Sequence, residues 1–173
     1  GHQPIGRGMG PALEARDVLA VLSNEAGAPQ DLLDKSCVLA GALLEIGGVS
    51  RPGGGAADAL ASIRDGRARR KFEAICAAQG GLREPPVAEH RRPLCAAAAG
   101  RVAGIDIRRL SRLAKLAGAP DQPAAGIEMQ VRLGVEVEAG QALCSLHAGS
   151  VGELRYALDY AAANPDIISV AQS

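Results

Sequence analysis

Hydrophobic residues in the first half of the chain recur every three or four positions, which is the spacing of amphipathic helices. Four such patterns follow one another between residues 11 and 80, and glycine pairs end the second and the fourth. Because no strand pattern lies among them, these four helices are interpreted as the outer layer of a larger α/β domain, or as a small bundle. The positions that define the four patterns are Ala15, Val18, Leu19 and Leu22; Leu33, Cys37, Ala40 and Leu44; Ala57, Leu60 and Ile63; and Phe72, Ile75, Cys76 and Gln79.

The hydrophobic period changes in the second half. Residues 82–95 are rich in proline and charge, which favours an exposed linker between domains. From residue 127 to 138 apolar and polar side chains alternate, predicting a long half-buried strand or a hairpin bent at Gly134. Further strands are predicted at 101–105, 142–148 and 167–171. Residues 96–173 are therefore predicted to form an α+β domain, which makes the whole chain α+β.

Two helices are predicted within this second domain. Asp106 can cap the first, and Ser150 with Glu153 forms a capping box for the second. The predicted buried stripes are Leu110, Leu113, Ala114 and Ala117 in the first helix, and Val151, Leu154, Leu158 and Ala161 in the second.

Composition and charge narrow the classes of partner. The 173 residues have a formal net charge of zero and only 2% aromatic residues, so neither nucleic acid nor an anionic membrane surface is expected as a partner. The four cysteines lack CxxC spacing and the three histidines lie far apart, which disfavours a metal site. Free thiols favour a reducing compartment, and we therefore expect a cytoplasmic protein.

Three stretches are candidates for binding chemistry. GHQPIGRGMG places Gly6, Gly8 and Gly10 just before a helix that begins at Pro11, and the free N–H groups of a helix start suit an anion. RPGGGAADAL, at residues 51–60, lacks the GK[ST] ending of a phosphate-binding loop and is interpreted as a flexible turn. The basic face made by Arg108, Arg109, Arg112 and Lys115 is interpreted as a solvated helix surface.

Several ordered segments resemble the thymidine phosphorylase and AMP phosphorylase family. They are QPIGRGMGPALEARDVL, DKSCVLAGALLEIGG, AAQGG, GRVAGIDIRRLSRLAKLAGAP and AGIEMQVRLGVEVEAGQALCSLHA. The first segment is similar to the AMP-phosphorylase-like branch, which includes bacterial thymidine phosphorylase relatives. Residues 1–81 would then belong to the central α/β domain, 82–95 to a linker, and 96–173 to the C-terminal, barrel-sandwich-like α+β domain.

The resemblance implies a pentosyltransferase that splits thymidine with inorganic phosphate into thymine and 2-deoxyribose 1-phosphate, without a metal or organic cofactor. Members of the family are longer than this chain, and their phosphate-binding and pyrimidine-contacting segments have no counterpart here. The opening is therefore interpreted as a truncation, and the fragment is predicted to be inactive. The resemblance implies no catalytic residue in this chain, and two substrate-binding positions, Gly8 in the glycine-rich loop and Lys35 on the following helix.

Alternative functions stay open at this point. The substrate could be AMP or another nucleotide instead of a nucleoside. The chain could also serve as a non-catalytic binding or oligomerisation module, and a homo-oligomer is expected. RLGVEVEAGQAL resembles the hairpin of biotinyl and lipoyl carriers, but the neighbouring Glu128–Gln130 turn has no lysine for attachment. An apolar stripe of the first 80 residues would be exposed in this chain, and we expect it to be buried either against a second copy or against the C-terminal unit. Its residues are Val18, Leu19, Leu22, Leu33, Ala40 and Leu44.

Overall fold

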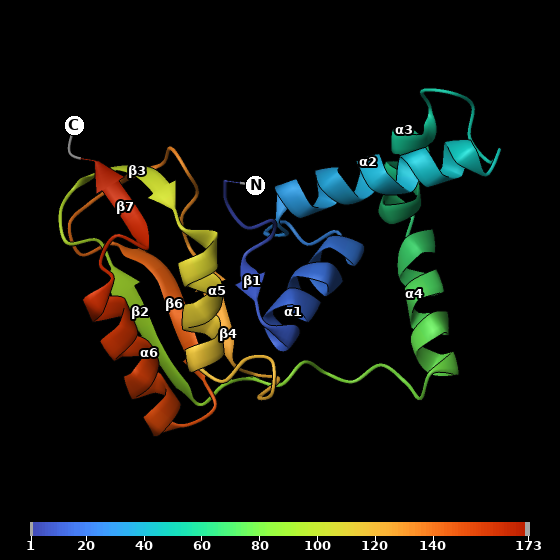
Figure 1. Ribbon diagram of the computed structural model, residues 1–173. Helices are drawn as coiled ribbons and strands as arrows, with labels where there is room; N and C mark the ends of the chain where they lie inside the picture. Colours follow the sequence, from blue (N-terminus) through green and yellow to red (C-terminus); the bar gives the residue numbers. More distant parts are fainter. Residues whose placement is uncertain (1, 172–173) are drawn as a thin grey trace. The chain divides into compact units, whose positions relative to one another are not determined.

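The computed structural model describes residues 2–171, which form two compact units (Figure 1). Residues 1–15 and 85–173 make up the first, here called the sheet unit, and residues 16–84 make up the second, the helical unit. The sequence grouped residues 1–15 with the helices that follow, whereas in the structure they pack with the C-terminal half. The assignment of these units to the domains of a longer enzyme stays a prediction.

The helical unit confirms the four predicted helices. They are α1 (Pro11–Leu22), which begins in the sheet unit, α2 (Gln30–Ile46), α3 (Gly55–Arg64) and α4 (Arg67–Ala78). The hydrophobic core of this unit is small, because only Val21, Cys37, Ala59 and Ile63 form its buried cluster. None of the α4 residues is buried.

Two antiparallel sheets form the sheet unit, and they confirm the α+β class. One has the order β1 (Gly8–Met9), β4 (Gly126–Met129), β6 (Ala142–Ala148) and β2 (His90–Cys95). The other has the order β5 (Glu136–Val137), β3 (Gly100–Ile105) and β7 (Ile168–Ala171). Helices α5 (Ile107–Leu116) and α6 (Val151–Ala163) complete the unit. Both sheets and both helices contribute to one core, whose fully buried larger side chains are Leu110, Leu113, Ile127, Leu146, Val102 and Cys144.

The alternating stretch at 127–138 is neither one strand nor a hairpin, which corrects the prediction. Its first part is β4, in the four-stranded sheet, and its last part is β5, in the three-stranded sheet. Between them the chain turns at Gly134, whose φ is +87°. The alternation continues through this change of sheet because Val131 and Val137 are both buried in the core that the sheets share.

Residues 90–95, which the sequence assigned to the linker, form strand β2. This strand pairs with β6 from His90 opposite Ala148 to Cys95 opposite Ala142. Pro93 lacks an N–H and therefore suggested a connection, but β2 is an edge strand of its sheet. An edge strand tolerates proline, because one side of its backbone needs no partner.

Both predicted helix caps of this unit are present. The Asp106 carboxylate accepts the Arg109 N–H at 3.0 Å, and the Ser150 hydroxyl accepts the Glu153 N–H at 3.2 Å. The α5 stripe is buried as predicted. In α6 the prediction was wrong for Val151, which is 67% exposed, since Leu154 and Ala157 provide the buried face.

Arg109 joins the start of α5 to the segment before β7. Its Nε donates to Asp106 at 2.8 Å, and its two terminal nitrogens donate to the two oxygens of Asp166 at 2.6 and 2.9 Å. These hydrogen bonds keep the pKa of Asp166 below its ordinary value of 3.8. The Arg109 backbone N–H, followed by its side chain, does the same for the pKa of Asp106.

The stability of the sheet unit should depend on these carboxylates at low pH. A carboxyl with a depressed folded-state pKa stabilises the fold above its unfolded pKa and loses this contribution as the pH falls through the folded pKa. We expect Arg109→Ala to be less stable at neutral pH and to lose less stability than the parent chain between about pH 5 and pH 3. Urea unfolding across this range measures the effect. Lys115→Ala, on the same helix, should keep the parent profile, and identical pH profiles for Arg109→Ala and the parent would contradict the assignment.

Candidate functional site

The glycine-rich opening is held as a strand and turn on the sheet unit. Gly6 and Gly10 have φ angles of +75° and +139°, which side-chain-bearing residues rarely adopt. Between them β1 pairs with β4, Gly8 opposite Glu128 and Met9 opposite Ile127. The segment that the resemblance associates with nucleotide is thus the edge of a sheet, which the sequence pattern did not predict.

Contacts from distant positions in the chain fix the residues before this strand. The Arg132 guanidinium donates to the Pro4 carbonyl at 3.1 Å, and the Leu133 N–H donates to the Gln3 side chain at 2.9 Å. The Met129 N–H donates to the Arg7 carbonyl at 2.8 Å. Sequence reasoning missed these anchors, because 122 to 130 residues separate the partners and no local pattern marks them.

Gly8 has a structural reason to be glycine. A Cβ at this position would lie 2.4 Å from the Leu13 carbonyl carbon and 2.7 Å from the Glu14 nitrogen, in the first turns of α1. Similarly, a Cβ on Gly126 would lie 2.1 Å from the Met9 carbonyl oxygen. The backbones of β1, β4 and α1 therefore touch where any side chain would intrude. Nucleotide contact at Gly8 stays a prediction beside this packing role.

The start of α1 is not the open anion site that the sequence suggested. The Ala12 N–H donates to the Pro123 carbonyl at 2.9 Å, and the Glu14 N–H donates to the Gly10 carbonyl at 2.9 Å. The Glu14 carboxylate accepts the Gly10 N–H at 3.1 Å. The N–H groups of Gly10, Ala12 and Glu14 already have acceptors within the protein. The Glu14 carboxylate lies where a bound anion would have to approach.

Lys35 lies exposed on α2, in the helical unit, whereas Gly8 belongs to the sheet unit. Two acids of the same helix, Asp31 and Asp34, precede it in the sequence, and Asp34 accepts a hydrogen bond from Gln30 at 2.6 Å. An exposed lysine on a helix can reach an anionic ligand as a flexible point charge. The substrate-binding role of Lys35 also stays a prediction.

The glycines at positions 53–55 lie where helices α2 and α3 approach each other closely. The Glu45 carboxylate accepts the Gly55 N–H at 2.9 Å, and its backbone hydrogen bonds with Gly53 and Gly55 lower the pKa of Glu45. A Cβ on Gly55 would lie 2.1 Å from the Gly41 carbonyl oxygen. These glycines let α3 approach α2, and a carboxylate occupies the amides that a phosphate would need.

Several other polar side chains form ion pairs. Within residues 2–171, no cluster of three or more histidine, cysteine, aspartate or glutamate side chains could hold a metal ion. The buried His147 places Nε2 3.5 Å from a Glu128 oxygen. On the basic face of α5, Arg109 is paired as described above, and Arg112 lies 5.5 Å from the ring centre of Tyr160.

Comparison with known proteins shows which family the chain resembles. Residues 101–167 match the family described as "Pyrimidine nucleoside phosphorylase C-terminal domain". Three bacterial relatives named "Putative thymidine phosphorylase", from Parvibaculum lavamentivorans, Tolumonas auensis and Chelativorans sp., are 60%, 59% and 59% identical over 170 residues. These alignments cover 98% of this chain and 34%, 34% and 33% of the relatives, so the chain spans about a third of their length.

Residues 101–167 of the sheet unit are therefore similar to the C-terminal domain of pyrimidine nucleoside phosphorylases. Over nearly its whole length the chain is similar to a part of proteins named as thymidine phosphorylases, and the resemblance seen in its sequence is confirmed.

Proposed function

We propose that this chain is the C-terminal part of a thymidine phosphorylase, and that it positions the glycine-rich segment near the nucleoside. The observation that carries the proposal is the 60% identity over 98% of the chain to a relative with that name. The attachment of residues 3–10 to β4 and to residues 132–133 supports a positioning role, because it holds this segment on a rigid domain.

The proposed reaction of the whole enzyme is phosphorolysis. A phosphate oxygen forms a bond to C1′ of deoxyribose while the bond from C1′ to the base breaks. The electron pair of that bond leaves with thymine, which takes up a proton. Catalysis then requires phosphate to be placed against C1′ and charge on the departing base to be stabilised. We propose inorganic phosphate as the co-substrate, no metal or organic cofactor, and a cytoplasmic location in keeping with the four free cysteines.

The isolated chain should release no base from thymidine, uridine or AMP in the presence of phosphate, since it has no counterpart of the family's phosphate-binding segments. Joined to the upstream two-thirds of the Parvibaculum lavamentivorans relative, it should support thymine release. The assay is chromatographic detection of free base. The intact relative is the positive control, and its upstream two-thirds alone are the negative control.

The results separate the alternatives. Turnover by the isolated chain after repurification would contradict the proposed inactivity. A chimera that prefers AMP to thymidine would identify a nucleotide phosphorylase. A folded but inactive chimera would favour a non-catalytic role for this chain.

We also propose that the chain self-associates through α2. Of the predicted stripe, Leu19, Leu22, Leu33 and Leu44 are half-buried, whereas Val18 and Ala40 are exposed. A different set of large apolar side chains is 56–83% exposed: Val38, Leu39, Leu43, Ile46 and Val49. Exposed apolar clusters of this kind usually mark interfaces.

Sedimentation velocity over a dilution series should therefore show reversible association. The double variant Leu43→Glu with Ile46→Glu should weaken that association at least about tenfold, because it places charge in the apolar contact. Ile75→Glu, which changes an exposed residue of α4, is the matched control. A parent chain that stays monomeric at every concentration would contradict the proposal.

A further inference from the structure

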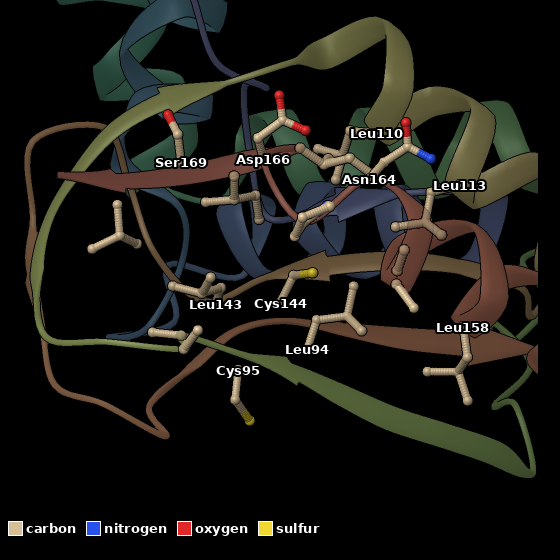
Figure 2. A pocket seen from close by; sticks show the side chains of 18 of the residues that line it. Leu94, Cys95, Leu110, Leu113, Leu143, Cys144, Leu158, Asn164, Asp166 and Ser169 are labelled. Carbon is tan, nitrogen blue, oxygen red and sulfur yellow. The ribbon is translucent and has the colours of Figure 1, made fainter.

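A cavity of about 790 Å³ lies within the sheet unit, beside β2, β6 and β7 and helices α5 and α6 (Figure 2). Its volume is in the range of small-molecule binding sites, which is about 300–1,000 Å³. None of its lining residues belongs to the glycine-rich segment or to α2. It is therefore separate from the positions to which the family resemblance assigns substrate binding.

The cavity is apolar in its depth and polar at its mouth. The deep wall includes Leu110, Leu113 and Cys144, all fully buried, and Leu94 points into the space from β2, whereas Cys95 points away (Figure 2). Burial raises the pKa of the Cys144 thiol to about 12, so this group is uncharged at neutral pH. The apolar part of a ligand fits this depth, because it gives up no hydrogen bonds to water when it enters.

At the mouth the charged lining residues are two acids, Asp159 on α6 and Asp166, both exposed. Both oxygens of Asp166 accept hydrogen bonds from Arg109, which compensates its charge. Among the described residues, Asp159 has no ion pair, and no lysine, arginine or histidine lines the cavity. The uncompensated charge at the opening is therefore negative.

Asn164, one of the neutral polar residues that line the cavity, also favours a donor. The side-chain N–H group of Asn164 donates to the Tyr160 carbonyl at 2.9 Å. The oxygen of the Asn164 amide remains as an acceptor, and it comes from the same side of the cavity as Asp166 (Figure 2). An ammonium group has three donors and no acceptor, and it matches such a mouth. A phosphate or carboxylate would meet a like charge and few donors.

We propose that this cavity binds a small amphiphilic amine, with its apolar part against Leu94 and Leu113 and its ammonium group at Asp159. This binding does not depend on the proposed phosphorylase function, and the acidic mouth disfavours the phosphate-bearing substrates of that function. The site is thus an additional one on the C-terminal domain.

Three probes with the same eight-carbon chain test the proposal: octylamine, octanol and octanoate, each below the concentration at which it aggregates. Titration of the 173-residue chain, followed by amide NMR shifts, gives the affinities and the location. We expect saturable shifts at Leu94 and Leu143. We also expect octylamine to bind about tenfold more tightly than octanoate, with octanol between them, since an exposed charge contributes attraction to one and repulsion to the other.

Two variants at the mouth test how much its charge contributes to the affinity for each probe. Asp159→Asn should reduce octylamine affinity about threefold, to the level of octanol, because it removes an exposed ion pair. Ala162→Lys adds a cation at an exposed lining position and should abolish the preference for octylamine over octanoate, because it compensates the charge of Asp159. Asp121→Asn, an exposed acid that does not line the cavity, is the control and should leave all three affinities unchanged.

The proposal fails if no probe shifts the lining residues. It also fails if the three probes bind equally, or if Asp159→Asn and Asp121→Asn behave alike. Equal binding would indicate an apolar groove for a side chain of a protein partner and not an amine site. None of these results changes the expected outcome of the phosphorolysis assay.

Discussion

Gly8→Ala is expected to lower the free energy of unfolding of the sheet unit by about 2 kcal/mol or more, because overpacking of well-packed sites costs about 1–3 kcal/mol and sometimes more. The added Cβ would lie 2.4 Å from the Leu13 carbonyl carbon and 2.7 Å from the Leu13 Cβ. Backbone, and not the end of a flexible side chain, has to move. Relief would require β1 to separate from α1 or from its partner β4.

Urea unfolding of the full chain measures this loss, and amide hydrogen exchange of residues 3–14 locates it. Gly152→Ala is the matched control in the same unit. Gly152 lies in α6, and an added Cβ there would lie 3.9 Å from the Ser150 hydroxyl oxygen, which is an ordinary van der Waals distance. This control should raise stability by up to about 1 kcal/mol, because alanine favours a helix over glycine.

The same variant separates packing from ligand contact. If Gly8→Ala destabilises the chain as expected, the glycine is required by the fold whatever it also does for nucleotide. If the variant is as stable as the parent, the packing argument is wrong. A loss of activity in the chimera without a loss of stability would then favour the ligand-contact role.

Gly55→Ala should destabilise the helical unit by about 2 kcal/mol or more, for the same reason of overpacking. The new Cβ would lie 2.1 Å from the Gly41 carbonyl oxygen and 2.9 Å from Glu45 Cγ. The contact is reciprocal, because a Cβ on Gly41 would lie 2.4 Å from the Ala56 nitrogen. With only four residues in the buried cluster, this unit has little other packing that could hold α2 and α3 together.

Hydrogen exchange of α2 and α3 in the full chain should show the loss locally, and urea unfolding should show its size. Gly27→Ala is the control, since nothing beyond its two chain neighbours lies within 4 Å of a Cβ there. It should change stability by less than about 0.5 kcal/mol, as surface substitutions away from special features usually do. Parent-like protection of α2 and α3 in Gly55→Ala would show that the two helices can separate without cost.

Local chemistry made most of the secondary structure predictable. The helical periods of residues 11–80 correspond to α1–α4, and the caps at Asp106 and Ser150 begin α5 and α6. These features depend on residues within about four positions of each other, and a sequence displays such interactions directly. The family resemblance could also be read from ordered segments, and the comparisons confirm it.

Tertiary structure decided where the glycine-rich segment is held and which glycines are required. The sequence placed residues 1–10 with the helices that follow them, but β1 pairs with β4, and Arg132 and Leu133 hold Pro4 and Gln3. It also could not tell that residues 127–138 pass from one sheet to the other, or that Pro93 lies in an edge strand. Sheet pairing and backbone contact join positions about 120 residues apart in the chain. The energy of these pairings and contacts depends on which surfaces pack together in the folded protein. A local pattern of side chains does not specify which distant surfaces those are.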